Sequence, residues 1–109
     1  MRRVLLIHRS GEQAAMLKAA LFHRGFEVRI EDQRWRAIQA LRQPLPEWEF
    51  VVVVGSASEE DVTLLRDLIT ASQQFHQSGI PDFLFAACSS CAPSLRIRIS
   101  RLGARYVRL

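Results

Sequence analysis

The sequence lacks several features that would assign it to a class of protein at once. It has no apolar run approaching the roughly 18 residues that a membrane-spanning helix needs. Its N-terminus does not combine a long apolar stretch with a small-residue cleavage site, so we expect no secretory signal. Its two cysteines, three positions apart, do not make the disulfide framework of a small secreted domain. We therefore expect a cytoplasmic protein without membrane contact.

Acidic residues are missing from the C-terminal part of the chain. All eleven lie between Glu12 and Asp82, and fourteen of the fifteen cationic residues are arginines. Residues 92–109 carry five arginines and no acid: Arg96, Arg98, Arg101, Arg105 and Arg108. This basic segment is either a solvated face enriched in arginine by codon bias or a docking surface for an acidic partner.

Short apolar runs alternate with helical patterns along the whole chain. This alternation indicates βα units and a parallel sheet within one domain over residues 1–109. Strands are predicted at residues 3–8, 26–30, 50–54, 82–87 and 106–109. The third strand is apolar at every position, which places it in the middle of a sheet with helices on both faces.

Helical spacing of apolar residues predicts the segments between the strands. The first helix is expected to end at Gly25 and to bury Ala14, Leu17 and Leu21, with Ala15 and Phe22 beside them. The second is expected to begin at Asp32 and to present Trp35, Ile38 and Leu41 on one face. The third begins after Ser58, with three acids in its first turn, and buries Val62, Leu65, Leu68, Ile69 and Phe75.

The segment before the last strand fits two patterns. Leu95, Ile97 and Ile99 alternate with arginines as in a strand, whereas Leu95, Ile99 and Leu102 have helical spacing. The βα alternation favours a helix that stops at Gly103. The strand at 106–109 then has no helix after it, which leaves one of its faces to be covered by something else.

The carboxyl ends of the apolar strands lack carboxylates. The first strand runs into His8-Arg9, the third into Gly55-Ser56 and the fourth into Cys88-Ser89. In open parallel sheets, ligands and chemistry gather beyond these ends. No pair of carboxylates is present there to hold a metal or accept a phosphoryl group. The pattern predicts a binding or regulatory module, without a cofactor, rather than an enzyme.

Four stretches carry a resemblance to a known family: Arg3–Ile7, Phe22–Val28, Ile80–Ala87 and Leu102–Val107. In the second, a helix runs into Gly, an aromatic residue and Glu-Val, and in the fourth Gly-Ala precedes an aromatic residue. With the order of elements, these stretches resemble the receiver domain of bacterial two-component response regulators. The resemblance implies a three-layer, doubly wound parallel five-stranded sheet in the order 2-1-3-4-5, without the family's final helix. It also implies the N-terminal domain of a larger regulator.

The chemical residues of that family do not carry over. The acidic pair that holds the cation corresponds to His8 and Arg9, and the phosphoacceptor aspartate to Val54 or Gly55. The switch hydroxyl corresponds to Ala86 or Ala87, and the lysine of the fifth strand to Arg108. The resemblance therefore implies a degenerate receiver that is not phosphorylated. It would act in signalling or transcription control through a protein partner or a second copy of itself, with the five arginines as the interaction surface.

Two functions of other classes stay open. Cys88-Ser89-Ser90-Cys91 has the spacing of a redox-active pair, although it follows the fourth strand, unlike a thioredoxin-type motif. The C-terminal arginines could contact an anionic nucleotide or nucleic acid, but no nucleic-acid-binding motif is present, so nucleic acid is expected mainly through an attached domain.

Three further residues are expected to be structural. We expect His8 to pair with Asp82 or with a backbone carbonyl, and Trp35 and Trp48 to be packing residues.

Overall fold

A computed structural model describes residues 2–8, 11–43, 48–55, 58–75, 80–87 and 92–108 of the chain. Its strands are β1 (Arg2–His8), β2 (Phe26–Glu31), β3 (Phe50–Gly55), β4 (Asp82–Ala87) and β5 (Arg105–Arg108). Its helices are α1 (Gly11–His23), α2 (Arg34–Arg42), α3 (Glu59–Phe75) and α4 (Pro93–Arg101). None of these helices is long and apolar enough to cross a membrane.

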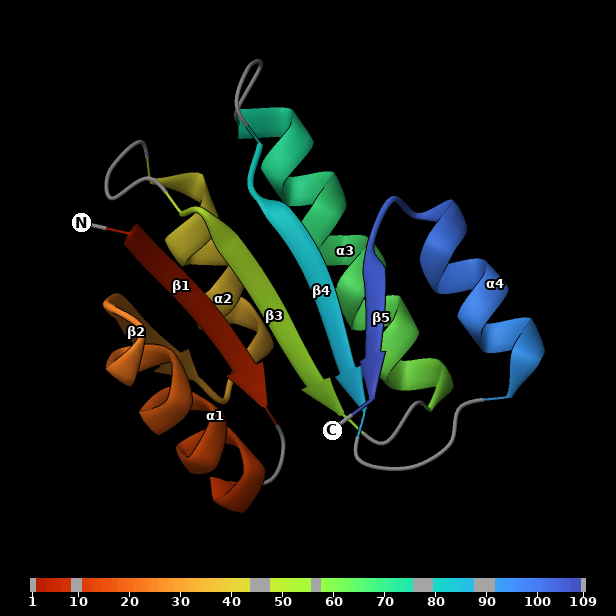
Figure 1. Cartoon of the computed structure of the whole chain (residues 1–109). Helices are drawn as coiled ribbons and strands as arrows, with labels where there is room; N and C mark the ends of the chain where they lie inside the picture. Colours follow the sequence, from red (N-terminus) through yellow and green to blue (C-terminus); the bar gives the residue numbers. More distant parts are fainter. Residues whose placement is uncertain are drawn as a thin grey trace.

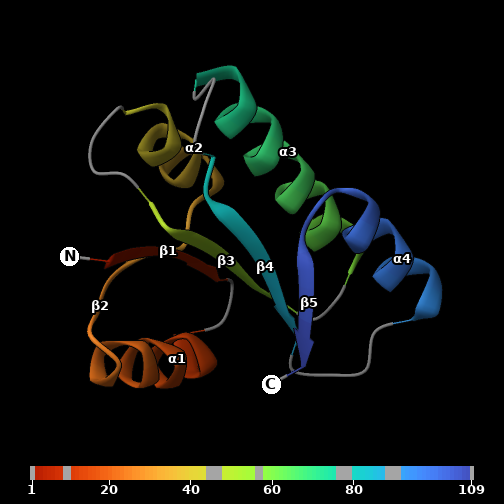
Figure 2. The same ribbon diagram turned by 45° about the horizontal axis from the view of Figure 1, so that its top comes forward.

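The five strands form one parallel sheet in the order β2-β1-β3-β4-β5. Helix α1 lies on one face of the sheet, and α2, α3 and α4 lie on the other (Figures 1 and 2). This arrangement confirms the predicted three-layer, doubly wound fold. Within the described residues no helix follows β5, as expected.

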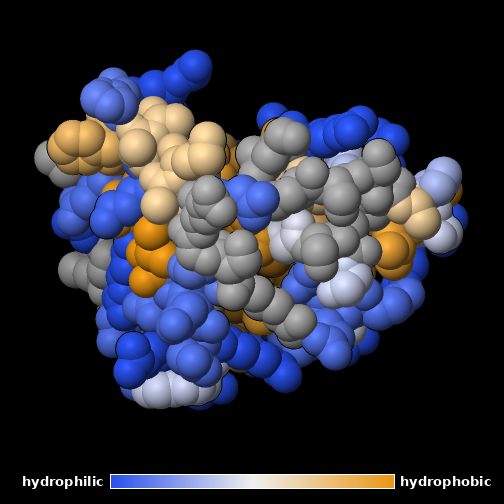
Figure 3. Space-filling view, turned by 90° about the horizontal axis from the view of Figure 1, so that it is seen from below, coloured by the Kyte–Doolittle hydropathy of each residue, from blue (hydrophilic) through white to orange (hydrophobic). Residues whose placement is uncertain are grey.

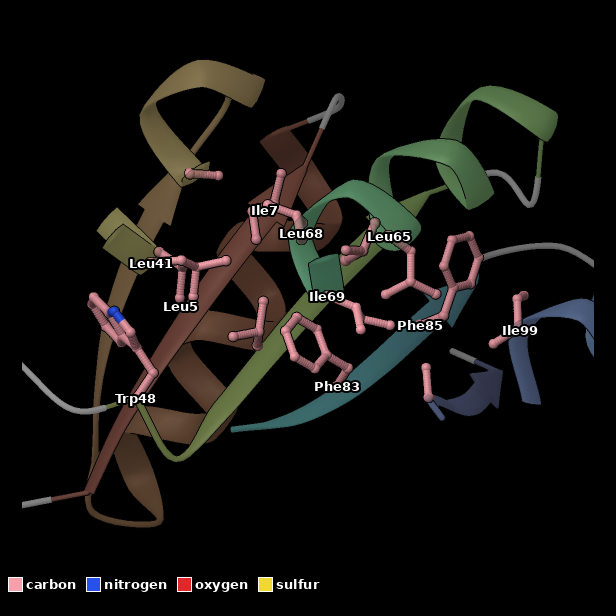
Figure 4. Packing of buried hydrophobic residues seen from close by; sticks show 14 of the residues in the cluster. Leu5, Ile7, Leu41, Trp48, Leu65, Leu68, Ile69, Phe83, Phe85 and Ile99 are labelled. Carbon is pink, nitrogen blue, oxygen red and sulfur yellow. The ribbon is translucent and has the colours of Figure 1, made fainter. Parts of the chain in front are cut away.

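The larger part of the core lies between the sheet and helices α2, α3 and α4. Side chains from the sheet and from all three of these helices meet there, among them Leu5, Leu41, Leu65, Phe85 and Ile99 (Figure 4). Strand β3 lies at the centre, and Val51–Val54 are buried on both of its faces, as its unbroken apolar sequence predicted.

A smaller cluster lies on the α1 face of the sheet. Val54 and Ala86 belong to it, together with Ala14 of α1. Val107 of β5 pairs with Ala86 and therefore points to the same face, yet 41% of its surface is exposed. The expectation that β5 keeps one uncovered face is thus confirmed for the described residues.

Helices α1 and α2 orient two aromatic residues differently from the prediction. Phe22 is 70% exposed and Trp35 is 60% exposed, so both packing assignments were wrong. Small side chains explain the difference, because α1 buries Ala14, while α2 buries Ala37 and Ala40 beside Leu41.

The start of α2 also differs from the prediction. Gln33, not Asp32, is the N-cap residue, and it makes no side-chain cap hydrogen bond. Trp48 does pack as predicted, and its Nε1 donates a 3.4 Å hydrogen bond to the Ala40 carbonyl.

The ambiguous C-terminal segment is helical. Helix α4 begins at Pro93 and buries Ile99 against the core, while Leu95 and Leu102 are half-buried. Gly103 follows with φ of +91°, a left-handed conformation that favours glycine and ends the helix. Strand β5 then begins at Arg105, one residue earlier than predicted.

Candidate functional site

The candidate site lies at the carboxyl ends of the parallel strands, and below we call this end of the strands the C-terminal edge of the sheet. The parallel register aligns His8 of β1 with Val54 of β3, and Val54 with Ala86 of β4. One residue further along, Gly55 aligns with Ala87, and Ala87 with Arg108. The structure therefore brings together every residue that the resemblance assigned to this edge, except Arg9, which lies outside the described residues.

These strand ends are mainly apolar and buried. Val54, Ala86 and Ala87 are each at most 4% exposed. Seen from this end of the molecule, apolar atoms of the described residues show between the hydrophilic surfaces of the helices (Figure 3). Over the described part of the chain, no three His, Cys, Asp or Glu side chains are grouped so as to hold a metal ion. None of the described strand-end residues His8, Val54, Gly55, Ala86, Ala87 and Arg108 carries a carboxylate.

A buried carboxylate reaches this edge from a helix. Asp61, in the first turn of α3, is only 1% exposed, and its backbone N–H donates a 3.3 Å hydrogen bond to the Ser58 hydroxyl. A Cβ atom placed on Gly55 would lie 2.5 Å from Asp61 Oδ2 and 2.7 Å from Asp61 Cγ. The Asp61 carboxylate therefore fills the space in which a side chain at position 55 would begin.

Sequence reasoning assigned Asp61 only a favourable position at the start of a helix and missed its role at this edge. The available signal was the spacing Ser58-x-x-Asp61, in which a hydroxyl cap is followed three residues later by an acid. Together with a glycine at the end of the preceding strand, that spacing points to an acid packed against the strand end.

His8 does not pair with Asp82, so that half of the prediction was wrong, while its pairing with a backbone carbonyl stays a prediction. Asp82 aligns with Phe50 at the beginning of β3, whereas His8 aligns with Val54 at its end. The two residues therefore lie at opposite ends of the strands. The Nδ1 atom of His8 is buried and has no hydrogen-bond partner.

A cavity of about 450 Å³ opens beside His8, between the end of β1 and the first turns of α2 and α3. Its lining includes charged residues of both signs. The lining residues are Ile7, His8, Asp32, Arg34, Glu59, Glu60, Thr63 and Leu64. Arg34 donates a 2.5 Å hydrogen bond to Asp67, and Glu59 accepts a 2.6 Å hydrogen bond from Arg98. The charges of Arg34 and Glu59 are therefore partly neutralised by Asp67 and Arg98, which do not line the cavity.

The basic segment forms one end of the molecule, on α4 and β5 (Figure 1). We call Arg96, Arg98, Arg101, Arg105 and Arg108 the arginine face, and all five are exposed. Arg96 lies over the ring of Tyr106, 4.9 Å from its centroid. The hydrogen bonds that Arg98 donates to Glu59 raise the pKa of Arg98. Residues 92–108 hold these five arginines and no acidic residue, and Glu59 pairs only with Arg98, so the arginine face carries an excess of positive charge.

The predicted redox pair, Cys88 and Cys91, lies outside the described residues. A thiol function therefore stays a prediction.

Comparison with known proteins identifies the fold. No protein-family model and no curated protein matches the sequence. Solved structures do match it. A response regulator from Thermotoga maritima superposes with a TM-score of 0.78 at 21% identity, covering 99% of this chain and 84% of that one. The non-phosphorylated HemR receiver domain from Leptospira biflexa gives 0.71 at 21% identity, covering 99% and 82%.

A third similar structure contains a phosphorylated residue and a metal ion. It is a response regulator from Burkholderia pseudomallei with a phosphorylated aspartic acid and a calcium ion, and it gives a TM-score of 0.76 at 17% identity. The match covers 99% of this chain but only 59% of the length of that protein. The chain described here has the fold of response regulator receiver domains.

Proposed function

We propose that this chain is a regulatory interaction domain of a signalling or transcription protein, one that neither accepts a phosphoryl group nor catalyses a reaction. The observation that supports this most directly is the end of β3. Val54 is buried in an apolar cluster, and the space beside Gly55 is occupied by the Asp61 carboxylate.

The chemistry of phosphoryl transfer explains why this observation matters. Transfer to a receiver requires a carboxylate nucleophile and a cation that offsets the developing charge. The similar protein from Burkholderia pseudomallei carries both a phosphorylated aspartic acid and a calcium ion. The resemblance aligns Val54 or Gly55 with the phosphoacceptor aspartate. Asp61 beside them is only 1% exposed, which supports its being shielded from a phosphoryl donor.

The arginine face supplies the proposed contact surface. Its five guanidinium groups lie within two consecutive elements, and apart from Glu59 on Arg98 no carboxylate pairs with them among the described residues. A concentration of one charge sign steers and orients partners of the opposite sign. We therefore propose that the domain contacts an acidic surface of a partner protein.

A second copy of this chain is the second candidate partner, favoured by the unpaired edge of β5 and by the exposed Val107. Edge strands present free backbone groups that can pair with another strand. A two-fold antiparallel pairing of β5 brings the arginine-rich strands of the two copies side by side. Like charges on neighbouring strands repel each other, and salt screens this repulsion.

Light scattering over a concentration series at low and high salt tests the form of this contact. We expect the mass of a monomer at low salt. A dimer that pairs through β5 should form only at high salt. A dimer at low salt that dissociates at high salt would contradict this expectation. It would mean that the arginine face binds acidic residues of a second copy, with no external acidic partner required.

A further inference from the structure

A groove between α3 and α4 suggests what the acidic partner inserts. Its volume is about 230 Å³, and it is lined by Val62, Thr63, Arg66, Arg98, Arg101 and Leu102. Val62 is buried and Leu102 is half-buried against the core, so the floor of the groove is apolar. The groove therefore combines an apolar floor with three guanidinium groups.

The ion pairs near the groove leave it positively charged. Arg98 is matched by Glu59, with a shortest separation of 2.6 Å. Arg66 lies 3.5 Å from Asp67, but that carboxylate also binds Arg34 at 2.5 Å, so two guanidinium groups share one carboxylate. Arg101 has no ion pair among the described residues. Positive charge is thus unmatched on both sides of the groove, at Arg66 on α3 and at Arg101 on α4.

The size of the groove points to a side chain as its occupant. Small-molecule sites commonly enclose about 300–1,000 Å³, and this groove is smaller. It suits one large apolar side chain, of the kind that anchors a peptide in a groove between helices. A phosphate backbone would use the arginines but would leave the apolar floor exposed, so the floor favours a peptide over a nucleic acid.

We propose that the groove between α3 and α4 binds an acidic peptide segment of a partner protein. One large apolar side chain occupies the floor, and carboxylates on either side of it pair with Arg66 and Arg101. This inference rests on the proposed function and specifies the chemistry of its partner. A symmetric dimer whose two-fold axis passes through the groove is disfavoured, since it would place this positively charged groove against itself.

The test measures binding of defined probes to the whole chain by fluorescence anisotropy. The first probe is a labelled synthetic peptide in which one phenylalanine stands between two runs of glutamate. The second replaces that phenylalanine with serine, and the third is a single-stranded oligothymidylate of similar charge. Amide chemical shifts of the protein, with and without the first peptide, locate the contact.

Two double variants are compared. Arg66→Glu/Arg101→Glu reverses the unmatched charge at the groove. Arg24→Glu/Arg36→Glu makes the same change in net charge at exposed positions after α1 and on α2. We expect the groove variant and the serine peptide each to weaken binding roughly tenfold or more. The control variant should retain most of the affinity, and the shifts should centre on residues 62–66 and 98–102.

Three results would overturn the inference. Equal affinity for the serine peptide or for the oligothymidylate would show that only charge matters. Shifts confined to Arg96, Arg105 and Tyr106, with unchanged affinity of the groove variant, would move the contact to the other side of α4. Absence of binding to any acidic peptide would remove the groove as a site. In each case the proposed absence of phosphoryl transfer is unaffected, since phosphate incorporation tests it separately.

Discussion

Replacing Val54 with aspartate will lower the free energy of unfolding by about 3–5 kcal/mol at neutral pH, the cost of an uncompensated buried charge. Val54 is 4% exposed, and the other buried members of the cluster on the α1 face are all apolar: Val4, Leu6, Ala14, Val52 and Ala86. An aspartate at position 54, which the resemblance aligns with the phosphoacceptor, should therefore destabilise the fold.

The effect of Val54→Asp should depend on pH in a defined direction. Burial disfavours the ionised form, so the pKa of the new carboxyl group should be raised in the folded state above its unfolded value. The penalty is then greatest above the folded pKa and shrinks as the pH falls toward the unfolded value of about 3.9. Urea denaturation at pH 8 and at pH 5 measures the difference.

Val54→Asn is the matched control, because the asparagine side chain has nearly the same shape as that of aspartate and does not ionise. Its stability loss should be smaller than that of Val54→Asp at pH 8 and should change far less between the two pH values. If Val54→Asp were as stable as the unsubstituted chain at pH 8, position 54 would have room for an acid, and the argument from burial would be wrong.

Gly55→Ala should destabilise the domain by about 1–3 kcal/mol, the range typical of overpacking. The backbone at Gly55 is not in the left-handed region, so alanine is not excluded by conformation. The cost arises instead from contact, because the new Cβ would lie 2.5 Å from Asp61 Oδ2 and 3.2 Å from Asp61 Cβ. An aspartate at position 55 would meet the same obstacle and would add a second carboxylate beside the first.

A double-mutant cycle separates this contact from other effects. In the Asp61→Ala background, Gly55→Ala should cost at least about 1 kcal/mol less than in the original chain, since residues in direct contact couple by about that much. Chemical denaturation of the four proteins gives the coupling energy. Additive effects would mean that Asp61 does not occupy the space beside Gly55.

The fold could be predicted from the sequence because its signals are local. The apolar β3, the helix stop at Gly103 and the spacing of Leu95, Ile99 and Leu102 each depend on residues close together in the chain. Exposure of Phe22 and Trp35 could not be predicted in the same way. Helical spacing identifies a face but does not decide whether a large or a small side chain of that face meets the sheet.

The site depended on register and on contacts between elements. Pairing of His8 with Asp82 was plausible from residue type alone. The parallel register excludes it, because the two residues lie at opposite ends of the strands. The packing of Asp61 over Gly55 depends on how α3 lies against the end of β3, a contact between elements that no local pattern gives. By contrast, the alignment of His8, Val54 and Ala86 was predictable once the strand order was known.

We propose above that this domain works without phosphoryl transfer. The most direct test incubates the chain with acetyl phosphate and Mg²⁺ and measures its intact mass, with a phosphorylatable receiver treated in parallel. We predict an unchanged mass for this chain while the parallel receiver gains one phosphoryl group. A phosphoryl adduct on this chain, abolished by replacing a single carboxylate such as Asp61 with asparagine, would contradict the account.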